Sequence, residues 1–161
     1  NILVENTDTF LFEDKRVSST RIREALLENN FHLAEKMLGR PYVISGKVVH
    51  GQHLGRTIGI PTANIWLPKQ KLPIDGVYAV ECNLNNEVIF GIANMGLRPT
   101  IGGDSPVLEV HLFNFNKSIY SQRLDIKFIE KIRNEKKFDN LDMLKSQIQK
   151  DISKAKEIIY K

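Results

Sequence analysis

The sequence predicts a mainly β domain, an antiparallel barrel or sandwich, with short helices before it and a longer helix after it. Six apolar, strand-like segments follow one another between residues 42 and 132, with hairpin-like connections and no helical pattern between them. Near the C-terminus, apolar residues recur at gaps of three and four, which is typical of a helix with one buried face. Closure of the strands into a barrel would leave no exposed sheet edges.

Two short helices are expected before the β region. Residues 1–16 show little pattern, and because the first residue is not methionine we expect a fragment of a longer protein. A helical pattern begins at Val17, where Ser18 can act as an N-cap. A second helix is expected over residues 31–38, and Gly39 is suited to end it.

The strands are bounded by turn-forming residues. Asn85 and Asn86 separate two of them and tolerate the positive φ angles of a tight hairpin turn. The six strands are expected at residues 42–50, 63–67, 77–84, 88–95, 107–115 and 124–132.

The C-terminal helix is expected to pack across the barrel. Asp139 or Asn140 can cap its start. Gln147 and the lysines are expected on its solvent-facing side. Its apolar stripe consists of Leu141, Leu144, Ile148, Ile152, Ala155 and Ile159.

Composition limits the class of protein. The 161 residues, 42% hydrophobic and 26% charged, suffice for one domain and a short appendage. No apolar run approaches membrane-spanning length and no secretion signal is recognisable, so no membrane partner is expected. Cys82 is the only cysteine, lies in an apolar segment and is expected to be an inert core residue in a cytoplasmic protein.

The positive charge is concentrated in the C-terminal part. Residues 117–161 carry twelve Lys/Arg and seven Asp/Glu, a net charge of +5, whereas residues 1–116 carry eleven and twelve, a net charge of −1. A basic face can bind nucleic acid or attract anionic substrates. A solvated surface is the preferred interpretation.

One glycine-rich segment carries most of the functional signal. It reads Gly51-Gln-His-Leu-Gly55-Arg56-Thr57-Ile-Gly59-Ile-Pro61-Thr62-Ala63-Asn64. Glycines let backbone amides approach a ligand, and gathered amides bind phosphate. Thr62 and Asn64 supply the oxygen ligands that Mg²⁺ prefers. The segment lacks the Walker ending and the dinucleotide-fingerprint spacing, so it predicts a different phosphate and metal site. A glycine-rich hairpin without a ligand is the alternative.

Glu109 is the second candidate. Alternation within residues 107–113 places Glu109 and His111 on the face opposite Leu108 and Val110. If that face looks into a barrel mouth, the carboxylate would lie beside apolar side chains and could accept a proton from a substrate hydroxyl. A solvent-facing glutamate on an edge strand is the alternative, and His111 is expected to be a packed or hydrogen-bonded structural residue.

Two arginines are further candidates. Arg98 lies in a glycine-rich segment, expected to be a loop, at residues 94–103, and a guanidinium can pair with phosphate through two parallel hydrogen bonds. Arg133 ends the sixth expected strand and is able to stack on an aromatic ligand. A solvated surface charge is the alternative for each.

Four ordered motifs carry a resemblance to a known family. They read Gly-x-x-x-Gly-Arg-x-x-Gly-x-Pro-Thr-Ala-Asn at 51–64, Asn-x-Gly-x-Arg-Pro-Thr at 94–100, Leu-Glu-Val-His-Leu-Phe at 108–113 and Ile-Arg-x-Glu-x-Lys-Phe at 132–138. The chain resembles riboflavin kinase, especially the C-terminal kinase module of bacterial bifunctional riboflavin kinase/FMN adenylyltransferase. Residues 17–23 look like the closing signature of the adenylyltransferase module. The resemblance implies a residual adenylyltransferase tail at 1–38 and a kinase barrel at 39–161, normally fused to an N-terminal module that is missing here.

The resemblance also implies a fold, a reaction and roles for residues. The fold is a six-stranded antiparallel Greek-key barrel with a C-terminal helix, and the reaction transfers the γ-phosphoryl group of ATP to the 5′-hydroxyl of riboflavin, giving FMN and ADP. Glu109 would be the catalytic base, Thr62 and Asn64 would contact Mg²⁺, and Arg98 and Arg133 would help to bind the flavin. Gly51, Gly55, Arg56, Gly59, Pro61, Thr62 and Asn64 would contact the nucleotide and its phosphates.

The sequence departs from the family pattern at a few positions. Asn114 stands where Asp is usual and Ser121 where Gly is usual, which concerns loop geometry. The adenylyltransferase His-x-Gly-His site is absent, so no FAD synthesis is expected from this chain. A non-catalytic basic barrel that binds nucleic acid is the alternative function, although the aromatics do not interleave with Lys/Arg as such binding requires. A third possibility is a remnant whose kinase site is closed without the missing module.

Overall fold

The computed structural model describes residues 9–51, 54–68, 72–100 and 103–161, so residues 1–8 of the expected tail lie outside it. The chain divides into two compact units, Asn1–Tyr42 and Val43–Lys161. The first unit contains the strands β1 (Leu11–Phe12) and β2 (Lys15–Arg16) and the helices α1 (Ser19–Leu27) and α2 (Phe31–Leu38).

Short-range sequence signals account for the first unit. The Ser18 hydroxyl and the Asn30 side-chain oxygen each accept a hydrogen bond from a backbone amide in the first turn of a helix. Gly39, with φ of 69°, ends α2 in the left-handed conformation. Both helices were predicted and are confirmed. The β1–β2 hairpin was not predicted, and its turn residues Glu13 and Asp14 both have positive φ angles.

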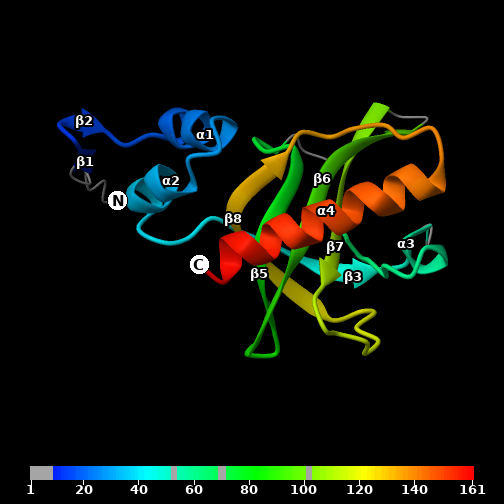
Figure 1. The fold of residues 1–161 in the computed structure, drawn as a ribbon. Coiled ribbons are helices and arrows are strands. Elements are labelled where there is room, and N and C mark those ends of the chain that lie inside the picture. The colour runs from blue at the N-terminus through cyan, green and yellow to red at the C-terminus, as the bar shows by residue number, and fades with distance from the viewer. Residues whose placement is uncertain (1–8, 52–53, 69–71, 101–102) are drawn as a thin grey trace. The chain divides into compact units, whose positions relative to one another are not determined.

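Figure 1 shows the strands of the second unit curling around one another. The six strands close into an antiparallel barrel in the order β3-β4-β7-β6-β5-β8. The order differs from the chain order, because β4 pairs with β7 instead of β5. The predicted six-stranded antiparallel barrel is therefore confirmed. The strands are β3 (Val43–Val49), β4 (Ala63–Ile65), β5 (Gly76–Leu84), β6 (Glu87–Thr100), β7 (Gly103–Leu112) and β8 (Arg123–Arg133).

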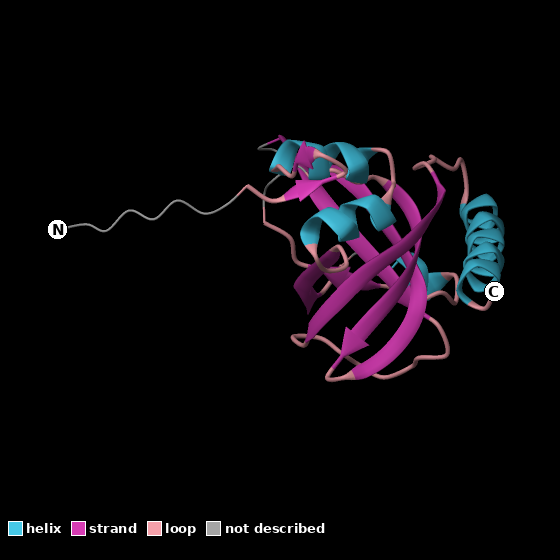
Figure 2. Cartoon of the chain, turned by 90° about the vertical axis from the view of Figure 1, so that its left-hand side faces the viewer, coloured by secondary structure: helices cyan, strands magenta, loops and turns pink. Residues whose placement is uncertain are grey.

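The barrel wall is packed over its inner face and, along one side, over its outer face. Helix α4 (Leu141–Ile159) lies against its outside (Figure 2). An outer cluster is formed by Ala79, Ile92 and Phe113 of the barrel with Ala155 of the helix. The largest fully buried side chains elsewhere in this unit are Tyr78, Val80, Cys82, Met95, Leu108, Val110, Leu124 and Ile126.

Two expectations about local structure were wrong. Residues 94–103 were expected to form a glycine-rich loop, but β6 continues to Thr100 and β7 starts at Gly103. The reason is a continuous ladder that pairs Asn94 with Glu109 and ends at Thr100 and Gly103. The glycine-rich segment 51–64 contains one helical turn, α3 (Leu54–Thr57), that periodicity did not indicate.

The C-terminal helix largely follows its prediction. Asn140 caps it by accepting a hydrogen bond from the Met143 amide at 2.9 Å. Ala155 is fully buried, while Leu141 at the start of the expected stripe is 48% exposed. Gln147 was expected to face solvent, which was wrong, because its side chain donates a hydrogen bond to the buried Asp151 at 2.9 Å.

The described residues contain no helix that is both long and apolar enough to cross a bilayer. Cys82 is fully buried, as expected. Burial, with a smaller contribution from the Glu81 carboxylate, raises the pKa of its thiol to about 12.

The two departures from the family pattern both fall on left-handed backbone. Asn114 has φ of 53° and Ser121 has φ of 66°. Asparagine tolerates this conformation, whereas serine gains nothing from it and its Cβ is strained there. The Ser121 amide donates to the Val48 carbonyl at 2.9 Å, so the turn is bonded to the barrel.

Ser121→Gly is therefore expected to raise the free energy of unfolding by about 0.5–1 kcal/mol. Relief of left-handed strain is partly offset by the greater entropy of glycine in the unfolded chain. The measurement is urea unfolding followed by circular dichroism. Ser118→Gly, in the same loop at a residue without positive φ, serves as the control and is expected to lower stability slightly. A loss of stability in Ser121→Gly as large as the control's would contradict the strain argument.

Candidate functional site

A row of polar residues crosses neighbouring strands at one level of the barrel. Asn64 of β4 lies directly opposite Glu109 of β7, which in turn lies opposite Asn94 of β6. The row continues through Val77 of β5 to Arg133 of β8. Directly opposed residues of antiparallel strands share one face with Cβ atoms about 4.5–5.5 Å apart. The predicted site residues Asn64, Glu109 and Arg133 therefore lie on the same face of the sheet as Asn94.

That face is the outer face of the barrel. Leu108 and Val110, the neighbours of Glu109, are fully buried toward the interior, whereas the Glu109 side chain is 31% exposed. The expectation that Glu109 looks into a barrel mouth is therefore corrected. Interior side chains fill the barrel beside Glu109, so a ligand that reaches this carboxylate lies against the outer wall.

One groove adjoins the polar row, and a second cleft meets this groove at Thr62. A groove of about 190 Å³ lies between the outer wall, the 55–62 segment and α4, and a second cleft of about 350 Å³ lies on the side of residues 115–120. Thr62 lines both. The groove is lined by Gly55, Ile58, Ile60, Thr62, Val77, Ile92, Asn94, Glu109, His111, Arg133, Glu135, Lys136, Phe138, Leu144, Ile148 and Asp151. The second cleft is lined by Val48, Arg56, Pro61, Thr62, Ala63, Val110, Leu112, Phe115, Asn116, Lys117, Ser118, Ile119 and Tyr120.

The glycines of the 51–64 segment make room for the residues that follow them. A Cβ on Gly51 would overlap the side-chain amide of Asn64, and one on Gly55 would overlap the carbonyl oxygen of Ile60. The Ile60 amide donates to the Gly55 carbonyl at 2.7 Å, which closes the turn after α3. Gly59 has φ of 78°, a conformation that side chains disfavour. The glycine spacing thus shapes the bend that ends in Asn64.

Arg98 lies beside Glu109. Its Nη2 atom is 3.6 Å from Glu109 Oε1, and both side chains are partly exposed. An ion pair in such a setting contributes at most about 1 kcal/mol, so water or a ligand can separate it at little cost. The structure therefore brings Arg98 and the predicted base together and leaves the carboxylate accessible.

Arg133 is held by an acidic residue that the sequence analysis missed. Its Nη2 atom donates to Asp151 Oδ2 at 2.8 Å and its Nε atom to the same carboxylate at 3.0 Å. Asp151 is 2% exposed, and Gln147 donates to its other oxygen at 2.9 Å. Asp151 stands seven residues after Leu144 and three after Ile148, so it lies on the apolar stripe of the helix. An acidic residue on an apolar stripe was the sequence signal for a buried partner.

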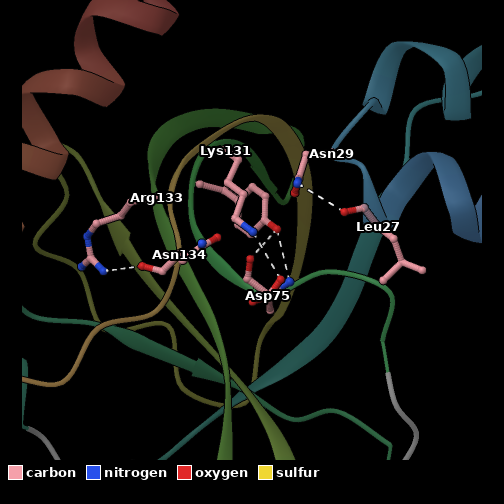
Figure 3. Close-up of polar contacts among 7 residues, drawn as sticks. Leu27, Asn29, Asp75, Lys131, Arg133 and Asn134 are labelled. Carbon is pink, nitrogen blue, oxygen red and sulfur yellow. Dashed lines mark hydrogen bonds and ion pairs between the residues drawn. The ribbon is translucent and has the colours of Figure 1, made fainter.

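Hydrogen bonds and close packing fix the end of β8, near Arg133, to the start of β5. Lys131 donates to the Asp75 carboxylate at 3.2 Å, and the Tyr78 hydroxyl donates to the Asp75 carbonyl at 2.7 Å (Figure 3). A Cβ on Gly76, whose φ is 101°, would overlap the Arg133 carbonyl oxygen. The Arg133 guanidinium also donates to the Asn134 carbonyl at 2.9 Å. These contacts hold the start of β5 against the end of β8, where the groove begins.

Comparison with known proteins identifies the family. Residues 38–159 match the riboflavin kinase (flavokinase) family model. The bifunctional riboflavin kinase/FMN adenylyltransferase of Haemophilus influenzae is 54% identical over 155 residues, which cover 96% of this chain and 50% of that protein. The chain thus spans about half the length of the curated relatives it matches. Together with the closed barrel and its polar row, these matches show that the chain belongs to the riboflavin kinase family.

Solved structures show the same fold. A chain from Streptococcus pneumoniae titled a macrolide-efflux protein aligns with a TM-score of 0.78 and 39% identity over 89% of this chain and 47% of its own. Riboflavin kinase from Trypanosoma brucei aligns with a TM-score of 0.54 and 24% identity over 75% of this chain and 81% of its own, which supports the fold alone. None of these matches favours the nucleic-acid-binding alternative.

Asp151→Ala is expected to lower the free energy of unfolding by about 3 kcal/mol, because it leaves the Arg133 guanidinium partly buried without its partner. Replacing both residues, as in Arg133→Met with Asp151→Leu, is expected to cost less than the single change. The measurement is equilibrium unfolding in urea. Arg123→Ala, which breaks the exposed pair with Asp125, is the control and should cost under about 1 kcal/mol. Equal losses in Asp151→Ala and the control would show that the pair does not hold α4.

Proposed function

We propose that this chain transfers the γ-phosphoryl group of ATP to the 5′-hydroxyl of riboflavin, giving FMN and ADP. One observation carries the proposal. Glu109 lies directly opposite Asn64, which ends the glycine-shaped bend, and it lines the groove together with Thr62, which also lines the second cleft. A base, a phosphate-binding segment and two adjoining clefts are what transfer between two substrates requires.

The clefts differ in a way that suits two different substrates. The groove joins apolar walls, such as Ile60, Phe138 and Leu144, to the polar row, as expected for a flat aromatic ring that carries a hydroxylated chain. The second cleft combines Tyr120 with the cations Arg56 and Lys117, which suits a nucleotide. We assign riboflavin to the groove and ATP to the second cleft, with the phosphates near Thr62.

Magnesium fits the donors at the bend. Thr62 and Asn64 offer oxygen ligands of the kind this hard cation prefers, and the Glu109 carboxylate is their neighbour. When bound, Mg²⁺ supplies neutralisation of the charge on the phosphates. The residues of the 51–64 segment would hold the phosphate chain in place, with Arg56 and the backbone of Gly55, Gly59 and Pro61 on the nucleotide side.

Glu109 would orient the riboflavin hydroxyl and take its proton as the new bond to phosphorus forms. Arg98, now 3.6 Å from this carboxylate, would leave it on substrate binding and move to a phosphate or to the flavin. Arg133 is already paired with Asp151, which neutralises most of its charge. Arg133 would therefore contact the flavin with the edge of its guanidinium and help to shape the groove.

The proposed setting of the chain follows from its relatives. We infer that residues 1–38 are the tail of an adenylyltransferase module, because the match to the bifunctional relative covers 96% of this chain but half of that protein. The proposed location is cytoplasmic, where ATP and riboflavin are available.

The chain is expected to convert riboflavin to FMN in the presence of ATP and magnesium, without forming FAD. Glu109→Gln should lower the turnover number by about 10²–10⁴-fold with little change in ADP affinity, because it removes the proton acceptor and keeps the size of the side chain. Chromatographic separation of riboflavin, FMN and FAD measures both outcomes. No FMN from the unaltered chain would refute the proposed function, and a loss below about 10-fold in Glu109→Gln would reduce Glu109 to a positioning role.

Gly51→Ala is expected to weaken magnesium-dependent ADP binding about as much as Asn64→Ala, because the added Cβ overlaps the Asn64 amide. In the double variant the overlap is gone, so the two losses should not add. Calorimetric titration with ADP, with and without magnesium, measures this coupling. Additive losses would mean that Gly51 acts independently of Asn64, and an unchanged magnesium dependence in Asn64→Ala would remove Asn64 from the metal site.

A further inference from the structure

A side chain of β7 is bonded to the backbone of the phosphate-binding bend. His111 Nδ1 lies 2.8 Å from the carbonyl oxygen of Pro61, fifty residues away in sequence. We propose that His111 is a positioning residue for phosphoryl transfer: its Nδ1–H···O=C bond to Pro61 sets the place of Thr62 and Asn64. The inference rests on the proposed function, in which Thr62 and Asn64 hold magnesium and phosphate.

Backbone hydrogen bonds between β4 and β7 do not extend to Pro61, so they cannot hold its peptide group in place. Strand β4 pairs with β7 from Ile65 opposite Leu108 to Ala63 opposite Val110, and the ladder ends there. Pro61 has no N–H group with which to continue it, and its carbonyl oxygen needs another donor. His111 is the next residue of β7, so its side chain continues the attachment one step beyond the last backbone pair.

The chemistry of the bond restricts the role of His111. A carbonyl oxygen only accepts, so the ring nitrogen facing it must carry a hydrogen. Nδ1–H is present in the charged imidazolium and in one neutral tautomer, so neither of these forms breaks the bond. Since this nitrogen is engaged by the backbone, the structure assigns His111 the task of holding the bend and leaves proton transfer to Glu109.

The ring is also held on its other side. The His111 and Phe113 rings contact edge to face with centroids 6.0 Å apart, and Phe113 belongs to the outer cluster under α4. His111 lines the groove in the same stretch of wall as Glu109. The imidazole therefore connects the bend to the packed outer wall. Glu109 does not depend on it, because backbone pairs on both sides hold its strand.

This arrangement predicts a selective kinetic defect. His111→Ala and His111→Gln should raise the KM for magnesium-ATP about 10-fold or more, the loss typical when a residue that orients a metal ligand is removed. The KM for riboflavin should change less than about 2-fold. His111→Asn should restore the KM for magnesium-ATP to within about 3-fold of the original, because its amide N–H lies near the position of Nδ1, whereas glutamine extends to that of Nε2.

A second readout needs neither substrate. The Thr62 amide belongs to the same peptide group as the Pro61 carbonyl, so its ¹H–¹⁵N resonance reports the tether in the ligand-free protein. It should shift in His111→Ala and His111→Gln and remain near its original position in His111→Asn. His32→Ala, which removes an exposed histidine of α2, is the matched control and should change neither readout.

The outcomes separate this inference from the proposed function. If His111→Asn and His111→Gln behave alike in the KM for magnesium-ATP and in the Thr62 resonance, or if His111→Ala changes neither, the positioning role is wrong. If the unaltered chain makes no FMN while the Thr62 resonance follows the expected pattern, the tether stands as structure and its role in phosphoryl transfer falls with the proposed function. A variant that raises both KM values equally would indicate general loss of structure and would also overturn the inference.

Discussion

The candidate site depends on the register between β4 and β7. Strand β4 is three residues long and is bonded to β3 on one side and β7 on the other. This pairing brings Asn64 opposite Glu109 from positions far apart in the sequence. A slip of one residue would turn the side chains of β4 to the other face, with Asn64 directed into the apolar interior. The buried neighbour Ile65 therefore protects the register, because a slip would expose its side chain to water.

The outer wall of the barrel carries Glu109 and the groove because interior side chains fill the barrel at that level. Leu108 and Val110 fill the interior beside Glu109, whereas the second cleft is lined in part by Val110 and Leu112. Helix α4 converts one side of the wall into a groove, and it is held there by apolar contacts and by the Arg133–Asp151 pair. Removing charge from water at Asp151 is costly, and the three hydrogen bonds from Arg133 and one from Gln147 offset that cost.

The sequence predicted features that depend on neighbouring residues in the chain. The cap at Ser18, the αL glycine at Gly39 and the Asn85–Asn86 turn follow from local chemistry and are confirmed. Errors arose where a distant partner decides the outcome. Residues 94–103 have turn-like composition, but the facing strand continues the ladder. Gln147 has an exposed position by periodicity, but Asp151 provides a buried partner.

By itself, the amino-acid sequence determined helices α1, α2 and α4 and the six barrel strands, the alternation that separates Glu109 from the core, and the glycine-rich motif with its Thr62 and Asn64. Each depends on side-chain period or backbone freedom within a few residues. Only the tertiary structure decided that Glu109 faces outward into the groove that α4 borders, that Gly51 makes room for Asn64, and that His111 holds Pro61. These contacts join residues from 13 to 50 positions apart, and barrel closure, which no local pattern encodes, determines which of them meet.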